Sequence, residues 1–193
     1  MNSFEHNPKL ITDEMSEQII QTAEKIVTNI GASKLTVRQI LKDLNITNRV
    51  FYNRFHNISE VLAHVYSRTI MKIRKSINQE YTIDRDFFEY VLDIVTESLI
   101  LSYDIKMKFN QYVFEYDSIS NSNYEWYRNR ITRLFEYAKE HNLIKDVDSE
   151  TLSYSIWCFC RGFNADAVMR MPKEEAISKF QYSFRILLNG LKK

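Results

Sequence analysis

The sequence contains very little glycine and proline. Among 193 residues there are 3 glycines and 2 prolines. So few turn-forming residues argue against a β-sandwich or barrel and favour helices joined by short loops. The 2 cysteines, Cys158 and Cys160, are too few for a disulfide scaffold. They lie two residues apart in an expected helix, where their side chains point to nearly opposite sides and can hardly bond each other. We therefore expect an all-α protein.

Long apolar runs and a strong net charge are also absent. No stretch of about 18 apolar residues occurs, so we expect no membrane span. The first residues lack the basic-then-apolar layout of a signal peptide, which makes the cytoplasm the expected location. With a formal net charge of +1, the molecule as a whole is not a polyanion binder, and any surface for nucleic acid must be local.

The sequence offers no pattern typical of a metal site or a catalytic centre. The 4 histidines are scattered without metal-ligand spacing. Phosphate-binding loops, nucleophile elbows and paired carboxylate motifs are missing as well. We therefore expect no metal, no cofactor and no enzymatic activity.

Helix-start signals follow one another closely in the N-terminal part. Apolar residues recur at helical spacing up to Gly31, which can end a helix, and Thr12 is the expected N-cap. Thr36 and Gln39 then form a predicted capping box, in which each side chain bonds the other residue's backbone N–H. This spacing predicts a first helix before residue 31 and a second that starts just after Thr36.

Two further starts make the helix that follows short. Thr47 is an expected N-cap between Ile46 and Phe51, and Asn57 begins another long helix. Asn45 stands in the turn before Thr47, and asparagine is one of the few residues that tolerates a left-handed backbone. Two short helices joined by a tight turn are the layout of a helix-turn-helix motif, whose second helix enters the major groove of DNA.

The stretch "ITNRVFYNRF", residues 46–55, interleaves apolar and polar side chains. We expect Val50, Phe51 and Phe55 to face the core, which leaves Asn48 and Arg49 on the outer side. Residues 34–58 also carry a local positive excess, which suits contacts with phosphates on a near-neutral protein. Its basic residues are Lys34, Arg38, Lys42, Arg49 and Arg54, against the single acid Asp43.

The order and spacing of these residues resemble the TetR family of transcriptional regulators. The matching residues are Thr36, Val37 and Ile40, then Ile46 and Thr47, then Phe51, Tyr52 and Phe55, then Glu60 and Leu62. Departures occur at Leu41, Asn45, Arg49, Val50 and Ser59, where the family usually has alanine, glycine, a pair of small residues and lysine. The resemblance implies an N-terminal three-helix helix-turn-helix domain and a C-terminal helical bundle for ligand binding and dimerisation.

Roles for the DNA-binding candidates follow from their chemistry and from the resemblance. Arg49 and Asn48 suit base edges, guanine and adenine respectively, with a phosphate contact as the rival reading. Tyr52 matches a tyrosine of the family that contacts a phosphate; core packing is the alternative role. Thr47 is expected either to bind a phosphate at the start of its helix or only to cap that helix. Lys34 and Arg38 suit phosphates. The predicted DNA-binding residues are Lys34, Thr36, Arg38, Thr47, Asn48, Arg49, Tyr52 and Asn53.

The rest of the chain reads as a helical bundle rich in aromatic residues. A helix is expected to run from Asn57 to about Tyr81, and Asp84 to start the next one. The aromatics between residues 81 and 163 form either a packed core or the walls of an apolar cavity, where members of the resembled family bind a small ligand. The candidate ligand-binding residues are Phe88, Tyr103, Met107, Asn110, Gln111, Phe114, Trp126, Arg128, Trp157 and Arg161.

The last two expected helices carry the candidate dimer interface. The helix after Ser149 is apolar on two sides, so it needs to be covered twice. In the resembled family this helix pair forms the dimer, and two DNA readers one turn of DNA apart need two-fold symmetry. The candidate interface residues are Phe159, Phe163, Phe180, Phe184 and Leu188.

The sequence thus predicts three segments: residues 1–56 bind DNA, residues 57–81 form a connecting helix, and residues 82–193 bind the effector and dimerise. The favoured hypothesis is a ligand-responsive regulator, a repressor, that acts as a homodimer on a palindromic DNA operator. A small all-helical enzyme or carrier that holds an apolar ligand in the aromatic-rich cavity is the alternative. Strong salt dependence of duplex binding would support the first, and turnover without DNA affinity the second.

Overall fold

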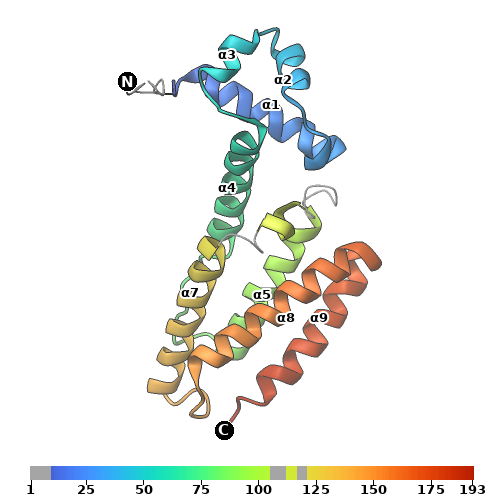
Figure 1. The fold of residues 1–193 in the computed structure, drawn as a ribbon. Helices are drawn as coiled ribbons and strands as arrows, with labels where there is room; N and C mark the ends of the chain where they lie inside the picture. The colour runs from blue at the N-terminus through green and yellow to red at the C-terminus, as the bar shows by residue number, and fades with distance from the viewer. Residues whose placement is uncertain (1–9, 105–111, 117–120) are drawn as a thin grey trace, which may run out of the picture. The chain divides into compact units, whose positions relative to one another are not determined.

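The computed structural model describes residues 10–104, 112–116 and 121–193, and every regular element in these ranges is a helix (Figure 1). The predicted all-α class is confirmed. The elements are α1 (Glu14–Ile30), a short 3-10 helix η1 (Ala32–Lys34), α2 (Val37–Leu44), α3 (Asn48–Tyr52), α4 (Ile58–Ser76), α5 (Phe87–Asp104), α7 (Asn121–Glu140), α8 (Ser149–Arg170) and α9 (Lys173–Asn189), and residues 112–116 are helical too. None of the helices described is both long and apolar enough to cross a bilayer.

The chain divides into two compact units, Met1–Thr69 and Ile70–Lys193. The division falls within α4, which therefore contributes residues to both units. This helix ends at Ser76, several residues before the predicted end near Tyr81. Arg130 of α7 explains the early end, because its guanidinium donates to the carbonyl oxygens of Ile77 at 3.2 Å and Gln79 at 2.5 Å, acceptors that would otherwise bond further helical N–H groups.

The start of α1 differs from the prediction by one residue. Asp13, and not Thr12, is the N-cap: its backbone is extended, with φ −149°, and its carboxylate accepts the N–H of Ser16 at 3.0 Å. The hydroxyl oxygen of Ser16 accepts the N–H of Asp13 in return, at 3.2 Å, so the two residues form a capping box. The predicted end at Gly31 is confirmed, with a φ of 98° that a side chain would strain.

The predicted turn between α2 and α3 is confirmed. Thr36 and Gln39 form the expected capping box, with the Thr36 hydroxyl oxygen accepting the Gln39 N–H at 3.3 Å. Asn45 ends α2 in the left-handed conformation, with φ 52° and ψ 45°. Its N–H is directed back at the carbonyls of the last turn of α2, and the chain then turns into α3.

An apolar core holds the N-terminal unit together. Arg68 of α4 reinforces the packing with a two-pronged ion pair to Glu17 of α1, one arm of which measures 2.7 Å. This guanidinium lowers the pKa of the Glu17 carboxyl. The core side chains, all almost completely buried, are Ile19, Ile20, Ala23, Val27, Ile40, Phe51, Phe55, Val61 and Val65.

In the C-terminal unit, α5 starts later than the sequence suggested. The predicted start at Asp84 is wrong, because the Asp84 carboxyl accepts a hydrogen bond from the side chain of Thr82, which lowers its pKa, and so belongs to a turn. Asp86 caps the helix instead, accepting the N–H of Glu89 at 2.8 Å. The regular structure begins one residue later, at Phe87.

The core of this unit is built from residues of α5, α7, α8 and α9, and α7 packs along α8 (Figure 1). Phe180 and Phe184 of α9 stack with their rings nearly parallel, 5.6 Å between centroids. Phe159 of α8 lies against both rings, at 5.6 and 5.7 Å. Aromatic side chains thus fill the space between the last two helices of the same subunit.

Candidate nucleic-acid interface and ligand cavity

The short helix α3 separates its apolar and polar side chains onto two sides. Phe51 is 0% exposed and Phe55 3% exposed, so both belong to the core of the unit, while Val50 is half-buried. Tyr52 is 50% exposed, and Arg49 is exposed as well. The helix therefore packs with one side and leaves a polar, basic side to the solvent.

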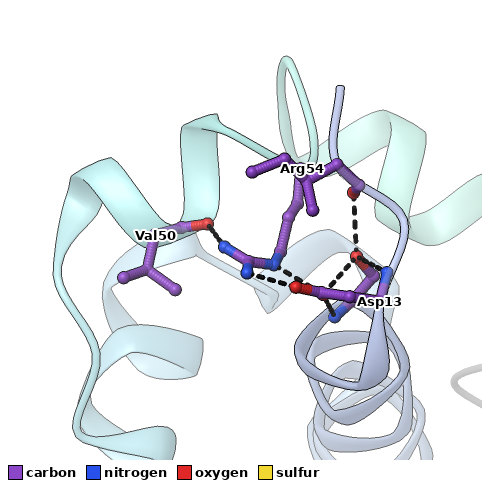
Figure 2. A network of polar contacts seen from close by, with 5 residues as sticks. Asp13, Val50 and Arg54 are labelled. Carbon is purple, nitrogen blue, oxygen red and sulfur yellow. Dashed lines mark hydrogen bonds and ion pairs between the residues drawn. The ribbon is translucent and has the colours of Figure 1, made fainter. Parts of the chain in front are cut away.

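Arg54 does not share that outer side. Figure 2 shows its guanidinium directed at Asp13 and at the backbone of Val50. Its Nε donates to Asp13 Oδ1 at 2.8 Å, and another nitrogen donates to the Val50 carbonyl oxygen at 2.8 Å. The guanidinium holds the pKa of the Asp13 carboxyl well below its usual value, and the carboxylate raises the pKa of Arg54.

This pairing corrects the predicted count of charges available to DNA. Arg54 is neutralised by Asp13, and its side chain is only 13% exposed. Because Asp13 caps α1 and Val50 lies in α3, the ion pair fixes the start of one helix against the end of the other. Arg54 therefore orients α3 from within the unit. The sequence pattern missed this because the two partners lie 41 positions apart.

Thr36 and Thr47 differ in how their hydroxyls are used. The Thr36 hydroxyl takes part in the capping box, donating to Gln39 Oε1 at 2.8 Å. Thr47 is the N-cap of α3 by its backbone, but no side-chain capping bond forms. All eight predicted DNA-binding residues are exposed: Lys34, Thr36, Arg38, Thr47, Asn48, Arg49, Tyr52 and Asn53.

A cavity of about 130 Å³ lies within the C-terminal unit. Helices α4, α5, α7 and α8 and residues 112–116 contribute to its walls, which are mainly apolar. Its polar or sulfur-containing lining residues are Ser98, Ser102, Asn123, Tyr127, Arg130, Trp157, Cys160, Arg161 and Asn164. The apolar residues include Ile70, Ile73, Ile77, Val91, Ile94, Val95, Val113, Phe114, Ile131, Leu134, Phe135, Ile156 and Ala165.

Three of the predicted ligand-binding residues line this cavity: Phe114, Trp157 and Arg161. The guanidinium of Arg161 lies 4.4 Å from the centre of the Phe114 ring and donates to the Phe114 carbonyl oxygen at 3.1 Å. The candidates Met107, Asn110 and Gln111 lie outside the described residues.

Four other ligand candidates lie away from the cavity. Phe88 packs against the core of the unit, with the Lys192 ammonium 5.3 Å from its ring centre. Tyr103 also packs on the core and donates its hydroxyl to the Met171 carbonyl oxygen at 3.1 Å. The hydroxyl of Tyr103 thus bonds neighbouring backbone of the same unit.

Trp126 and Arg128 are occupied on the surface of α7. The guanidinium of Arg74 lies 5.0 Å from the Trp126 ring centre, a cation–π contact. Arg128 pairs with Glu150 of α8 at 3.8 Å. Both side chains connect α7 to neighbouring helices, and neither is among the residues that line the cavity.

Several lining residues were not predicted from the sequence. Among them, Asn164 and Arg130 have polar side chains that can form hydrogen bonds. Asn164 lies three positions after Arg161, so both belong to one side of α8. A polar pair at this spacing within an otherwise apolar helix side was the available signal. In the described ranges no three His, Cys, Asp or Glu side chains are grouped to hold a metal ion.

The predicted dimer interface needs correction. Phe180 and Phe184 are 0% exposed within the single chain, and Leu188 is 3% exposed. They fill the core between α9, α5 and α8, so they have no surface left for a second subunit. Phe159 and Phe163 are half-buried in the same aromatic cluster. The stripe was identified correctly as apolar, but it faces inward.

Exposed apolar side chains lie on the opposite sides of the same two helices. Tyr182 and Ile186 of α9 are 71% and 57% exposed, one turn apart. Tyr154 and Met169 of α8 are exposed too. Between them on α8, Gly162 is open to the surface, with no atom within 4 Å of where a Cβ would stand. We call Tyr154, Met169, Tyr182, Ile186 and Leu187 the outer apolar face.

The fold and the site together define a class: a helix-turn-helix unit joined to a helical unit that encloses a cavity. No protein-family model matches the sequence, and no curated protein matches it. Solved structures do match, and TetR-family transcriptional regulators are among them, such as one from Pectobacterium atrosepticum with a TM-score of 0.76 and 13% identity over 93% of this chain and 94% of that one.

Two other regulators are similar. The TetR regulator from Haloarcula marismortui has a TM-score of 0.75 and 15% identity, over 93% of this chain and 99% of that one. SmeT, the repressor of a multidrug efflux pump of Stenotrophomonas maltophilia, has a TM-score of 0.73 and 17% identity, over 92% and 90% of the two chains. The chain has the TetR-family fold, and the resemblance seen in its sequence is confirmed at that level.

Proposed function

We propose that this chain is a transcriptional regulator that binds double-stranded DNA through α3 and responds to a small molecule in its C-terminal unit. The division of α3 into two sides carries the proposal. Phe51 and Phe55 anchor the helix in the core, and Arg49 and Tyr52 are left exposed beside them. A helix that reads DNA must pack on its neighbours and face the major groove at once.

The charges around α3 support the same reading. Lys34, Arg38, Lys42 and Arg49 are exposed within one short segment, and Asp43 is its single acid. Arg54 adds no charge to this surface, because Asp13 neutralises it. A local basic patch on a protein of net charge +1 suits the phosphate backbone of DNA.

Individual roles within the patch follow from side-chain geometry. Arg49 and Asn48 read base edges, since arginine bonds guanine and asparagine bonds adenine in a bidentate manner. Lys34 and Arg38 hold phosphates, which positions the protein without specifying sequence. The exposed hydroxyl of Tyr52 suits a phosphate as well. The hydroxyl of Thr47 makes no capping bond to α3, so it is available to bind a phosphate.

The proposed active form is a homodimer on a palindromic operator, because one five-residue helix reads too few bases alone. The outer apolar face of α8 and α9 is the surface we assign to the dimer. Its exposed aromatic and aliphatic side chains are the kind that a partner covers, and Gly162 leaves room for a close helix–helix approach.

We further propose that the regulator is a repressor whose effector occupies the cavity. SmeT, which shares the fold, is a repressor. An occupant would contact Ile70 and Ile73, which belong to the part of α4 that lies in the C-terminal unit, and Ile77, which follows the end of that helix. A ligand shifts a protein between two conformations only if it binds one of them more tightly. Because α4 forms part of the cavity wall, a change in the position of α4 would change the affinity for the ligand.

Selection of bound duplexes from a random pool tests DNA binding, symmetry and site together. A palindromic product is expected. Arg49→Ala should then weaken specific binding by about 1–3 kcal/mol and relax the preference at one position of each half-site. Lys34→Ala should weaken binding to all sequences alike and reduce the salt slope by about 1.

Arg133→Ala is the matched control, since Arg133 is an exposed arginine of α7, outside the N-terminal unit. It should leave both affinity and salt slope unchanged. If Arg49→Ala keeps the sequence preference intact, Arg49 contacts phosphate and the assigned role is wrong. A pool that yields no enriched duplex would refute the proposed function, and turnover of an apolar compound would then favour the enzyme alternative.

The dimer surface is tested separately by Ile186→Glu. A charge placed in an apolar interface should dissociate the dimer, measured by sedimentation velocity, while circular dichroism stays unchanged. Ile83→Glu is the control, because Ile83 is 64% exposed and lies outside the outer apolar face. A dimer that survives Ile186→Glu would place the interface elsewhere.

A further inference from the structure

The walls of the cavity carry charge of one sign. Arg130 of α7 and Arg161 of α8 line it, and no aspartate or glutamate is among its described lining residues. Arginine stays protonated at every pH at which proteins are folded. Burial raises the pKa of the Cys160 thiol to about 12, so this residue contributes no negative charge. The charged side chains among the described lining residues are therefore both arginines.

The contacts of Arg130 leave its charge in place. It donates to Asn78 Oδ1 at 2.6 Å and to the carbonyl oxygens of Ile77 and Gln79. These acceptors are neutral, and among the described residues no carboxylate forms an ion pair with Arg130. They hold the guanidinium still without cancelling its charge.

The other polar groups gather around Arg161. Asn164 follows it by three positions on the same side of α8, and its Nδ2 lies 3.5 Å from Ser102 Oγ of α5. Asn164 Oδ1 is buried and meets no hydrogen-bond donor among the described residues. Exchanging the oxygen and nitrogen of this amide would leave its NH₂ in that place instead. In either orientation one amide atom of Asn164 has hydrogen-bonding capacity left for an occupant.

Size and shape limit the rest of the occupant. The other walls are aliphatic and aromatic, and the volume is about 130 Å³. An engineered apolar cavity of about 150 Å³ holds one benzene molecule, which sets the scale. The cavity thus suits an apolar body of the size of a single ring with one polar head.

We propose that the cavity binds a small apolar carboxylate, its head group between Arg161 and Asn164 and its apolar body against α4, α5 and α7. A carboxylate accepts two parallel bonds from a guanidinium, which a neutral or cationic head cannot do. A cation of the same shape would be placed beside the two half-buried arginines of the lining, Arg130 and Arg161. The assignment of this carboxylate as the effector rests on the proposed function. Its binding in the cavity does not depend on that function.

The test uses benzoate, benzyl alcohol and benzylamine as probes of one ring size and three head groups, measured by calorimetry on the whole chain at pH 7. Benzoate should bind at least about tenfold more tightly than benzylamine, because a guanidinium attracts the carboxylate and repels the ammonium. Arg161→Gln should weaken benzoate by about ten- to hundredfold and leave benzyl alcohol nearly unchanged. Equal affinity for benzylamine would overturn the proposal.

Two variants protect the test against a folding defect. Arg133→Gln removes an exposed arginine of α7 that does not line the cavity, and benzoate affinity should persist. Asn164→Leu keeps the volume and removes the amide, and should weaken benzoate severalfold in a chain with an unchanged helical spectrum. If Arg161→Gln folds and binds benzoate as tightly as the parent does, the head group lies elsewhere and the proposal is wrong. If Arg161→Gln fails to fold, Asn164→Leu decides: benzoate affinity equal to that of the parent would again show that the proposal is wrong.

Failure of this proposal is distinguishable from failure of the proposed function. Duplex selection is carried out without any probe, so its result does not depend on what the cavity binds. A chain that selects a palindrome but prefers benzylamine keeps its function and loses this inference. A chain that prefers benzoate but selects no duplex keeps the carboxylate site and loses the regulator.

Discussion

Phe184 offers the sharpest test of which side of α9 faces inward. It is 0% exposed, stacks on Phe180 and touches Phe159. Phe184→Ala removes the ring and leaves a cavity that the helices around it close only in part. Truncations of buried phenylalanine cost about 3–5 kcal/mol. For a chain of this length each kcal/mol lowers Tm by roughly 2–4 °C, so a loss of roughly 6–20 °C is expected.

The assay is thermal unfolding followed by circular dichroism at two protein concentrations, with sedimentation velocity on the folded variant. Lys179→Ala is the control, since Lys179 is exposed on the same helix and pairs only with Glu175 at 2.7 Å among the contacts described. It should change stability by less than about 0.5 kcal/mol. Because a dimer melts at a temperature that depends on concentration, the two concentrations separate subunit stability from association.

One result would refute the reasoning. If Phe184→Ala dissociates the dimer but leaves the melting of the subunit unchanged, Phe184 belongs to the interface and not to the core. The assignment of the outer apolar face to the dimer interface would then be wrong. A lowered Tm with the dimer intact at low temperature is the outcome that the burial of Phe184 predicts.

Three further predictions concern the N-terminal unit. Asp13→Asn should make the free energy of unfolding less dependent on pH in acid. Arg54 lowers the pKa of Asp13 below the unfolded value of 3.8, so in the parent the ion pair stabilises the fold above about pH 4 and this stabilisation is lost as the pH falls further. Urea unfolding between pH 3 and 7 would measure the difference. Asn45→Ala should cost about 1–2 kcal/mol and Asn45→Gly little, since only the latter adopts a φ of 52° without strain; equal losses in urea unfolding would contradict this. Thr36→Ala should cost about 1 kcal/mol through its lost capping bond, and a Thr36→Ser variant that fails to restore the stability in urea would contradict that cause.

Local signals were readable from the sequence because they depend on residues three or four apart. The capping box at Thr36, the left-handed Asn45 and the helix end at Gly31 are all of this kind. Asn57 also caps as predicted, with its side chain accepting the Glu60 N–H at 3.0 Å. Errors of one to three residues arose where two acceptors compete, as Thr12 and Asp13 do at the start of α1.

Features that depend on packing were not readable. The helix α9 carries apolar residues on two opposite sides, Phe180 and Phe184 on one and Tyr182 and Ile186 on the other. Periodicity identifies both sides as apolar but cannot say which one the rest of the subunit covers. Here the more aromatic side is covered by α5 and α8, which reverses the predicted interface.

The cavity shows the same limit. Aromatic content pointed to Phe114 and Trp157, which line it, and equally to Phe88 and Trp126, which do not. Lining is decided by which sides of α4, α5, α7 and α8 converge, and composition contains no such information. The polar pair of Arg161 and Asn164 was the available signal, but only the placement of α8 beside α5 shows that it faces the cavity.

The start of the described chain has a practical consequence for handling the protein. Ile11 donates its N–H to the Asn53 carbonyl oxygen at 2.8 Å, just after α3, and the Asp13–Arg54 ion pair lies next to this bond. Ile11 therefore lies beside the end of α3. A bulky label attached close to Ile11 would stand next to the surface proposed to meet DNA. One attached after Lys193 begins in the other unit, which makes the C-terminus the better place for a label in binding assays.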